Sequence, residues 1–386
     1  MSKKILFVIN SLDFFISHRL VLAEAAKIEK YHVIIFYGSG SVADQKCLQG
    51  MGYEVRKFDL QRSGINLWVE VKSFISLYRM VYECRPDLIH LITIKPILYG
   101  GLIARVLKVP AVVSAVAGLG FLSKYNRSMR ARVIRTLAYP LLYLALMHRN
   151  QRLIFQNSSD LDVLKDLLNI EEARINLIPG SGIDLSTAKY TEEPNGELVV
   201  SMASRLLHDK GVKEFIHAAI RIKQSGINAR FWLIGEPDPG NPNSVTHEEL
   251  DSMNADGFVE LLGFRRDVLE LYAQSHIVTL PSHYGEGLPK SLIEASAIGR
   301  AIVTTDMPGC RDAVVNGETG LLVKPMDVDG LVTALQTLLM NKELRQEMGR
   351  HGRGLAEKKF DVQFVIDTHL RIYRQLLDQL PANRGI

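Results

Sequence analysis

Short apolar runs alternate with longer amphipathic segments along most of the 386-residue chain, and the whole series occurs twice. The first series predicts strands at Ile5–Ile9, His32–Tyr37, Glu54–Phe58, Leu88–Ile92, Ala111–Ala115, Leu153–Gln156 and Ile175–Ile178. The second series predicts strands at Leu198–Met202, Arg230–Ile234, Val259–Leu262, Ile277–Leu280, Ala301–Thr304 and Gly320–Val323. Helical patterns such as Ser17–Lys30, Leu67–Cys84 and Val212–Gln224 lie between them. Such alternation predicts an α/β chain with two doubly wound, Rossmann-like domains.

The polar, turn-rich stretch from residue 180 to residue 197 separates the two series. We therefore expect an N-terminal domain over residues 1–182 and a C-terminal domain over residues 183–361. The last helical pattern, Val362–Leu380, ends before Pro381. Ligands of parallel sheets bind beyond the carboxyl ends of the strands, so chemistry is expected just after predicted strands.

Composition excludes several classes of protein. The hydrophobic fraction of 47%, the charged fraction of 23% and the net charge of +4 are typical of a soluble enzyme and do not indicate nucleic-acid binding. Three distant cysteines fit a reducing compartment. No apolar run is long enough to span a bilayer, and the first run is interpreted as a buried strand rather than a signal peptide. No cluster of histidine and cysteine has metal-binding spacing, so no metal is expected.

Two glutamates, Glu286 and Glu294, flank the stretch that follows the strand Ile277–Leu280. Pro289 suits the first position of a helix, and the amides of the first turn would then face an anion. Carboxylates at these places can accept hydrogen bonds from sugar hydroxyls. The alternative is a capping carboxylate followed by a solvated helix residue.

Two cations, Arg205 and Lys210, follow the strand Leu198–Met202 and precede Gly211. A diphosphate leaving group needs positive charge where its negative charge develops, and an arginine can hold two phosphate oxygens at once. Two solvated surface cations are the alternative interpretation.

Glycines end two further strands of the second series. Gly235 and Gly263 would let the backbone approach a ligand closely, and a planar base could lie along Phe264 and Arg265. Each glycine could instead serve only as a strand-ending turn.

The segment from Lys124 to Arg152 holds seven lysines or arginines, no aspartate or glutamate, and an apolar centre. Such a segment can lie on an anionic bilayer. It could equally be a core helix flanked by surface cations. The cations expected at the membrane are Lys124, Arg127, Arg130, Arg132 and Arg135.

In combination these features resemble the retaining GT-B glycosyltransferases of family 4, over nearly the whole chain. The Glu-x7-Glu pair lies inside "EGLPKSLIEA", the cations belong to an "SRL…KG" pattern, and "PGCRDAVVNGETGLLV" has the family's form. In the N-terminal half, "FFISHRLVLAEAA" and "HLITIKPILYGG" resemble the branch that builds O-antigen, capsule and N-glycan precursors. That branch includes bacterial N-acetylgalactosaminyltransferases acting on undecaprenyl-diphosphate sugars.

The resemblance implies roles for the residues of the second domain. Arg205 and Lys210 would hold the donor diphosphate, Glu294 the ribose hydroxyls and Glu286 the transferred sugar, and "GFRRD" would line the uracil. The expected donor contacts are Arg205, Lys210, Gly235, Phe264, Arg265, Glu286, Gly287, Leu288, Pro289 and Glu294. The family needs no metal, because cations and a helix end replace the divalent ion.

The resemblance also implies roles in the first domain. Relatives often place a histidine near the donor sugar, and His18 is the candidate here, with His90 as the alternative. A lone histidine after a strand can also be a structural hydrogen-bonding group. Lys95, Gly118 and Gly120 are expected at the acceptor, and the final segment, 362–386, is expected to cross back to the first domain.

We therefore expect a cytoplasmic glycosyltransferase on the inner face of the bacterial membrane. It would move a hexose or N-acetylhexosamine, GalNAc in the first instance, from a UDP-sugar to an undecaprenyl-diphosphate-linked sugar. The alternatives are a UDP-sugar epimerase of GT-B architecture and a non-catalytic sugar-nucleotide-binding regulator.

Overall fold

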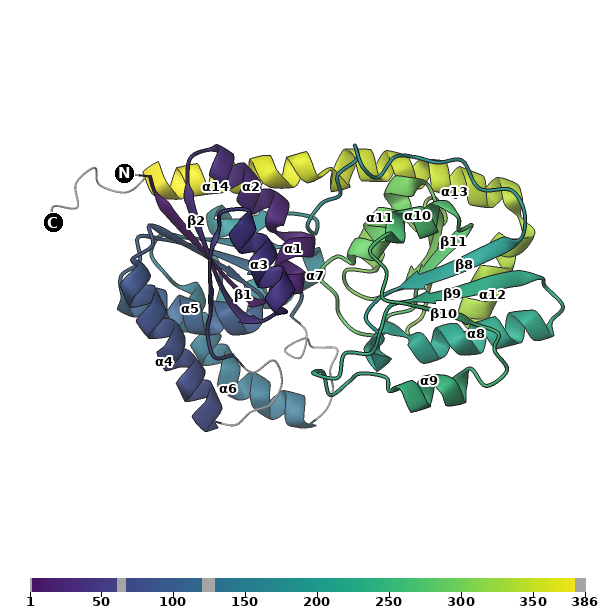
Figure 1. Cartoon of the computed structure of the whole chain (residues 1–386), viewed down its shortest axis with the longest axis horizontal. Coiled ribbons are helices and arrows are strands. Elements are labelled where there is room, and N and C mark those ends of the chain that lie inside the picture. Colours follow the sequence, from purple (N-terminus) through teal and green to yellow (C-terminus); the bar gives the residue numbers. More distant parts are fainter. Residues whose placement is uncertain (1, 61–66, 120–128, 379–386) are drawn as a thin grey trace. The chain divides into compact units, whose positions relative to one another are not determined.

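The computed structural model describes residues 2–60, 67–119 and 129–378. The chain divides into two compact units, one of Met1–Ser181 with Phe364–Ile386 and the other of Gly182–Gln363 (Figure 1). The boundaries predicted from the sequence lie within two residues of these, and the last helix belongs to the first unit for most of its length. Each unit is an α/β domain and is described by itself.

The first unit is built on a parallel sheet of seven strands in the order β3-β2-β1-β4-β5-β6-β7. In chain order its elements are β1 (Lys4–Ser11), α1 (Leu12–His18), α2 (Leu20–Ile28), β2 (His32–Ser39), α3 (Val42–Gly50), β3 (Glu54–Lys57), α4 (Leu67–Cys84), β4 (Leu88–Ile92), α5 (Ile94–Val106), β5 (Ala111–Val116), α6 (Met129–Leu146), β6 (Gln151–Phe155), α7 (Ser158–Leu168), β7 (Ile175–Leu177) and α14 (Val362–Asp378). Apolar residues of α4, α5, α6 and α7 cover one face of this sheet and form its main core.

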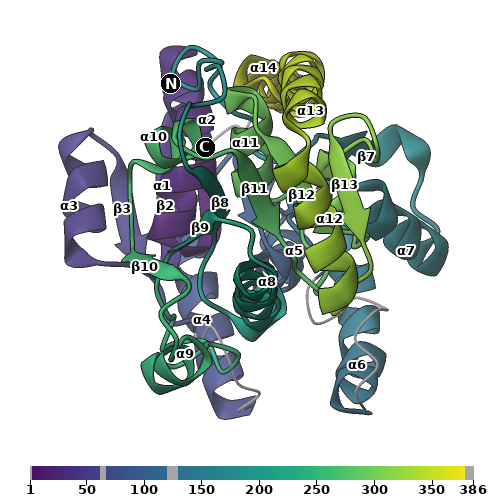
Figure 2. The ribbon, with the colours of Figure 1, turned by 90° about the vertical axis from the view of Figure 1, so that its right-hand side faces the viewer.

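The second unit repeats the architecture with six parallel strands in the order β10-β9-β8-β11-β12-β13 (Figure 2). Its elements are β8 (Leu198–Ala203), α8 (Val212–Gln224), β9 (Ala229–Ile234), α9 (His247–Met253), β10 (Glu260–Gly263), α10 (Val268–Ala273), β11 (Ile277–Leu280), α11 (Lys290–Ile298), β12 (Ala301–Thr305), β13 (Gly320–Val323), α12 (Val328–Met340) and α13 (Lys342–Leu355). Helix α12 packs on α8, and α13 packs on α11. In both sheets the strand order reverses beside the first strand, which is where ligands of such sheets bind.

Every strand predicted from the sequence is present, but the first predicted helix is wrong in its bounds. The segment after β1 forms α1 and α2 rather than one helix over Ser17–Lys30. The break falls at Arg19, whose backbone leaves the helical region at φ −134° and ψ −10°. Its side chain is fully buried and donates a hydrogen bond to the carbonyl of His18, at 2.9 Å.

A buried polar cluster joins α14 to the first sheet. His90, on β4, lies with its Nδ1 2.6 Å from the hydroxyl of Tyr373 on α14. His369, one turn earlier on α14, donates from Nδ1 to the carbonyl of Val365 at 2.7 Å. Burial, reinforced by the nearby Arg19 cation, lowers the pKa of His369 to about 3, and burial lowers the pKa of His90 well below its ordinary value. Both imidazoles are therefore neutral at physiological pH.

Acidification should destabilise the chain through these two histidines. The pKa of His369 is about 3 in the folded state and about 6.5 in the unfolded state, so its stabilising contribution is complete above pH ~6.5 and is lost as the pH falls. Such a histidine costs about 2 kcal/mol at pH 5, because only the unfolded chain takes up the proton. Urea unfolding at pH 7 and pH 5 measures this difference. His369→Gln should reduce it, while His351→Gln, at an exposed position, should not. An equal acid loss in wild type and His369→Gln would contradict this account.

Candidate active site

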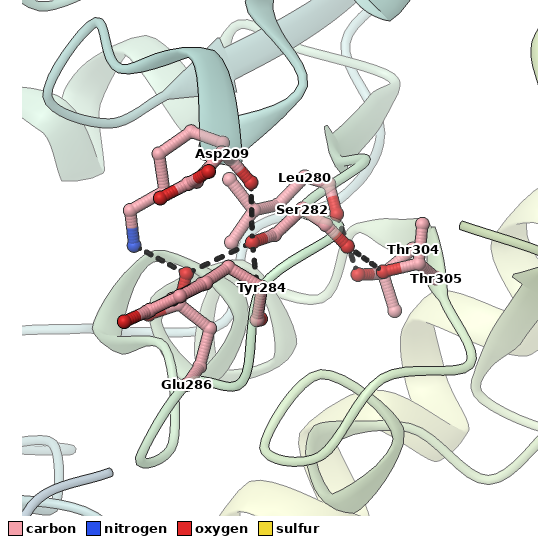
Figure 3. A network of polar contacts seen from close by, with 8 residues as sticks. Asp209, Leu280, Ser282, Tyr284, Glu286, Thr304 and Thr305 are labelled. Atoms are coloured by element: carbon pink, nitrogen blue, oxygen red, sulfur yellow. Dashed lines mark hydrogen bonds and ion pairs between the residues drawn. The ribbon is translucent and has the colours of Figure 1, made fainter. Parts of the chain in front are cut away.

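A network of polar contacts forms at the carboxyl end of β11 (Figure 3). Lys210 donates from Nζ to Oε1 of Glu286 at 2.5 Å, although the two residues lie 76 positions apart. The hydroxyl of Ser282 lies 2.9 Å from the same carboxylate oxygen and 2.9 Å from the carbonyl of Asp209. The Lys210 and Glu286 side chains are only 17% and 15% exposed. The fold thus brings one predicted cation and one predicted carboxylate into a single, mostly buried ion pair.

Two glycines allow the loops of this network to approach each other. Gly211, with φ +79°, ends the turn that carries Lys210, and a Cβ there would lie 2.2 Å from the carbonyl oxygen of Pro281. Gly309, with φ +81°, backs the loop of Glu286, and a Cβ there would lie 2.5 Å from the carbonyl oxygen of Gly287. Any other residue would be strained by its φ and would collide with the backbone. These glycines therefore determine where Lys210 and Glu286 meet.

Threonines on β12 hold the same loop from behind. Thr304 donates to the carbonyl of Leu280 at 2.7 Å, and Thr305 donates to the carbonyl of Ser282. Burial, with a contribution from the nearby Glu286 carboxylate, raises the pKa of the Cys310 thiol to about 12. The thiol therefore stays protonated, and it packs beside the ion pair as an apolar group.

The helix that follows Glu286 begins one residue later than the sequence predicts. Pro289 is the N-cap of α11, with φ −63° and ψ 122°, and Lys290 is the first helical residue. The amide of Leu292 was expected to face a ligand, but it donates to the carbonyl of Pro289 at 3.2 Å. Gly287, Leu288 and Pro289 are all buried against the domain core.

Glu294 lies one turn inside α11. Burial raises the pKa of its carboxyl group, and Lys290 opposes the shift. The two charged groups are 3.5 Å apart, across one helical turn. This carboxylate is mostly covered and is paired with Lys290, which differs from the solvated helix glutamate of the alternative interpretation.

Arg205 makes a different ion pair from Lys210. Its Nη1 donates to Oδ2 of Asp238 at 2.9 Å, and the Asp238 side chain is mostly buried. The loop that carries Asp238 is joined to the Arg205 loop through main-chain bonds, from Leu206 to Glu236 at 3.0 Å and from Val245 to Leu206 at 2.9 Å. Each predicted diphosphate contact is thus held by its own carboxylate.

Gly235 follows β9 and Gly263 ends β10, and both have a positive φ that favours glycine. A Cβ at Gly235, which has φ +137°, would lie 1.9 Å from the carbonyl oxygen of Ser204, so this glycine is explained by a close approach within the domain. Gly263, with φ +66°, ends β10. Phe264 follows it, 63% exposed, with its amide donating to Glu236 at 3.3 Å. Arg265 pairs with Asp267, at 2.7 Å from Nε to Oδ1.

The two candidate histidines of the first unit differ in exposure. His18 ends α1, where it is half-buried, stacks on Phe14 and lies 2.6 Å from the hydroxyl of Ser17. His90 is completely buried in the cluster with α14, so no ligand reaches it and the structural alternative describes it correctly. Neither histidine could be assigned from the sequence, because only the fold decides which face of the sheet each one meets.

Two of the predicted acceptor residues, Lys95 and Gly118, lie at the carboxyl edge of the first sheet. Lys95, at the start of α5, donates to Glu70 at 2.8 Å, and Tyr99 donates to the other oxygen of the same carboxylate. Gly118 follows β5 with φ +97°. Gly120 lies outside the described residues.

The predicted membrane segment is described in part. Lys124 and Arg127 lie outside the described residues, as do the side chains of Arg130, Arg132 and Arg135 on α6. The later part of α6 buries Leu142 and Leu146 in the core. Three apolar side chains in the same part of the helix are exposed: Leu141, Tyr143 and Leu144. This part of the helix therefore contributes to the core, and the contact with a bilayer stays a prediction.

Two global features complete the description. Within the ranges that the structure describes, no group of three or more metal-ligating side chains occurs. Within the same ranges, no helix has the length and hydropathy needed to cross a membrane.

Three residues of the candidate site were not predicted from the sequence. Ser282 lies directly after a predicted strand, so the expectation of chemistry at strand ends could have included it. Asp238 lies four residues after β9, but its partner Arg205 is a non-local neighbour. Gly309 belongs to a quoted motif, and its contact with the Glu286 loop is visible only in three dimensions.

Comparison with known proteins supports both halves of the molecule. Residues 4–158 match the model "Glycosyl transferase 4-like", and residues 187–355 match "Glycosyl transferases group 1". Among solved structures, Anabaena HepE in complex with UDP superimposes with a TM-score of 0.73 at 18% identity, covering 96% of this chain and 100% of that one.

Curated relatives resemble the chain along its length. The N,N'-diacetylbacillosaminyl-diphospho-undecaprenol alpha-1,3-N-acetylgalactosaminyltransferase of Campylobacter jejuni is 30% identical over 93% of this chain and 95% of the relative. The UDP-Gal:alpha-D-GlcNAc-diphosphoundecaprenol alpha-1,3-galactosyltransferase of Escherichia coli is 28% identical over 80% of each.

Two Rossmann-like domains, with a lysine–glutamate pair beside a helix start in the second, define a glycosyltransferase of the GT-B class. Similarity to a relative over nearly all of both chains then establishes the family. The chain belongs to the family 4 glycosyltransferases, which carry the 4-like and group 1 domains.

Replacing Gly309 should disturb the network more than replacing a glycine with the same backbone conformation. Gly309→Ala adds a Cβ against the Glu286 loop, whereas Gly317→Ala meets open space at φ +79°. Gly317→Ala should cost about 1 kcal/mol of unfolding free energy, and Gly309→Ala at least about 2 kcal/mol, with a matching loss of activity. Urea unfolding and sugar transfer measure the two effects. Equal costs in both variants would show that the loop contact is unimportant.

Proposed function

We propose that this glycosyltransferase moves a hexose or N-acetylhexosamine, GalNAc in the first instance, from a UDP-sugar to an undecaprenyl-diphosphate-linked sugar with retention. The observation that carries the proposal is the Lys210–Glu286 pair at the carboxyl end of β11, next to the start of α11. The activities named for the Campylobacter and Escherichia relatives support the acceptor class, and the UDP complex of HepE supports the donor class.

The leaving group of this reaction is UDP, whose diphosphate gains negative charge as the sugar departs. The ammonium group of Lys210 has three N–H bonds, and one of them goes to Glu286. The remaining donors, together with Arg205 and the start of α11, would stabilise the diphosphate. In this proposal no metal ion is required, because protein cations supply the positive charge.

Glu286 would contact the transferred sugar. Lys210 and Ser282 both hold its Oε1, so the orientation of the carboxylate is set before the donor binds. Glu294, buried one turn into α11, would accept hydrogen bonds from the ribose hydroxyls. Phe264 and Arg265 would lie along the uracil.

The acceptor would be reached at the inner face of the bacterial membrane. Helices α4 and α6 each follow a strand of the parallel first sheet, so both start at its carboxyl edge. Helix α4 exposes Trp68 to 84%, with Val71 and Ile75 on the same side. Tryptophan beside aliphatic and basic residues is typical of a surface that contacts lipid headgroups.

Two rival functions make different predictions for UDP release. A transferase releases UDP in proportion to the glycosylated lipid, and it does so only when the acceptor is present. An epimerase would convert the UDP-sugar without an acceptor, and a regulator would bind it without turnover. Mass spectrometry of the lipid product, with UDP-GalNAc, UDP-Gal, UDP-GlcNAc and UDP-Glc in turn, tests the proposal. It is contradicted if no lipid product forms with any of these donors.

Substitutions in the ion pair should separate turnover from binding. Glu286→Gln keeps the size of the side chain and should lower kcat about 100-fold while UDP still binds. Lys210→Ala should weaken UDP binding about 10- to 100-fold, because it removes a charge-assisted contact. Lys165→Ala removes an exposed ion pair elsewhere and serves as the control. Calorimetry with UDP and steady-state kinetics measure both effects, and wild-type values in the two variants would refute the roles.

Charge reversal on α6 should release the protein from membranes. The triple variant Arg130→Glu, Arg132→Glu and Arg135→Glu should lose at least about 100-fold in binding to phosphatidylglycerol-containing vesicles, since each cation near such a surface contributes about 1 kcal/mol. A variant with the same charge change at exposed positions of the second unit, Lys213→Glu, Lys358→Glu and Lys359→Glu, is the control. Co-sedimentation measures binding, and equal losses in the two triple variants would contradict a specific membrane surface.

A further inference from the structure

Thr93 joins β4 to α5 in a backbone conformation that its side chain disfavours. Its φ is +73° and its ψ is 162°. Among the described residues, six that are not glycine have positive φ, and Thr93 is the only β-branched one. A branched Cβ clashes with the backbone in this region, which is occupied essentially by glycine. Residues held in such conformations cluster at functional sites, where the surrounding structure maintains them.

The hydroxyl of Thr93 has no hydrogen-bond partner although it is buried. Near its end, the neighbouring strand β1 also has a residue whose buried side-chain oxygen has no partner. Val8 pairs with Leu91, so Asn10 is level with Thr93 two positions further on. The side-chain carbonyl oxygen of Asn10 is likewise buried and unpartnered. Buried polar atoms are nearly always paired in proteins, and two orphans on adjacent strand ends need an explanation.

Both residues stand at the edge of the sheet where ligands of parallel sheets bind. Each one is partly exposed, although its oxygen is covered. They stand at the carboxyl ends of β1 and β4, the position beside the first strand where the sheet order reverses. Lys95, held by Glu70, is two residues beyond Thr93. This edge therefore combines a strained residue, two unpaired oxygens and an oriented cation.

We propose that Thr93 and Asn10 bind neighbouring hydroxyl groups of the acceptor sugar. An amide oxygen accepts a hydrogen bond from one sugar hydroxyl, and a threonine hydroxyl both donates to and accepts from the next. The ligand would supply the partners that the protein does not. The conformation of Thr93 sets the direction of its hydroxyl, which explains why glycine does not stand there. This inference rests on the proposed function, since it specifies the acceptor side of that reaction.

Two substitutions of Thr93 remove the hydroxyl but differ in their effect on the backbone strain. Thr93→Gly relieves the backbone strain, and Thr93→Val keeps both the branch and the strain. Thr93→Ser keeps the hydroxyl, and Lys30→Gly relieves a positive φ of 65° at an exposed position elsewhere in the same unit. Transfer from UDP-GalNAc to undecaprenyl-diphosphate-linked N-acetylhexosamine gives KM for each substrate, and thermal unfolding gives Tm.

We expect the Gly and Val variants to raise the acceptor KM at least ten-fold, with the donor KM and UDP binding unchanged. Thr93→Gly should also raise Tm, so the more stable protein is the poorer enzyme. Thr93→Ser should stay within two-fold of wild type in acceptor KM. Lys30→Gly should raise Tm and leave the acceptor KM unchanged. Asn10→Leu should raise the acceptor KM as well. If both residues bind one sugar, the double variant Asn10→Leu, Thr93→Val should raise the acceptor KM by less than the product of the two single effects.

Several outcomes would overturn the inference. An unchanged acceptor KM in both Thr93→Gly and Thr93→Val would mean that the orphan oxygens have a purely structural role. A rise in donor KM instead would place the residues at the wrong substrate. If the wild type transfers sugar normally while these variants behave as wild type, only this inference fails. If the wild type transfers nothing to the lipid acceptor, the proposed function fails and takes the inference with it.

Discussion

The ion pair between Lys210 and Glu286 depends on the close approach of three loops, and the rest of the second domain is arranged to permit it. The turn after β8 carries the cation, the loop after β11 carries the carboxylate, and the loop after β12 supports the carboxylate loop from behind. A charged pair this deeply buried is favourable only when its geometry is good and its other hydrogen bonds are satisfied. Ser282 provides such a bond, and Thr305 holds Ser282 in turn. Parallel strands make this possible, since they deliver all three loops to one edge of the sheet.

The two domains share a topology but use their strand ends differently. In the second domain the two predicted phosphate-binding cations are paired before any ligand is present, Lys210 with Glu286 and Arg205 with Asp238. A donor diphosphate would have to share these cations with carboxylates that already orient them, which favours a preorganised site. In the first domain Thr93 and Asn10 keep unpaired oxygens at the corresponding edge.

The last helix joins the sheet of the first unit through polar as well as apolar contacts. Tyr373 and His369 meet His90 in a region where Arg19 is also fully buried. Burial lowers the pKa of Arg19 to about 10, so the guanidinium remains charged at neutral pH while both imidazoles remain neutral. A polar cluster of this kind specifies one docking position, because a shifted helix would leave more of these groups unpaired. The first domain is thus completed by residues that come last in the chain.

The sequence by itself determined the strands, the two-domain α/β class, and the candidate residues Glu286, Glu294, Arg205 and Lys210. The period of the apolar pattern and the position of a residue after a strand are local properties of the chain. These inferences therefore needed no coordinates. It failed where the deciding contact was non-local. It missed α1 and began the next helix at Ser17, because the break at Arg19 accompanies a side chain that only the fold buries. It left His90 open, because only the fold shows that α14 covers this residue. Asp238 and Gly309 became visible only through partners elsewhere in the chain, whereas Ser282 lies close enough to a predicted strand to have been included. Local patterns specify elements and candidate chemistry, and tertiary structure decides which charges meet, because pairing depends on loops that the sheet brings together.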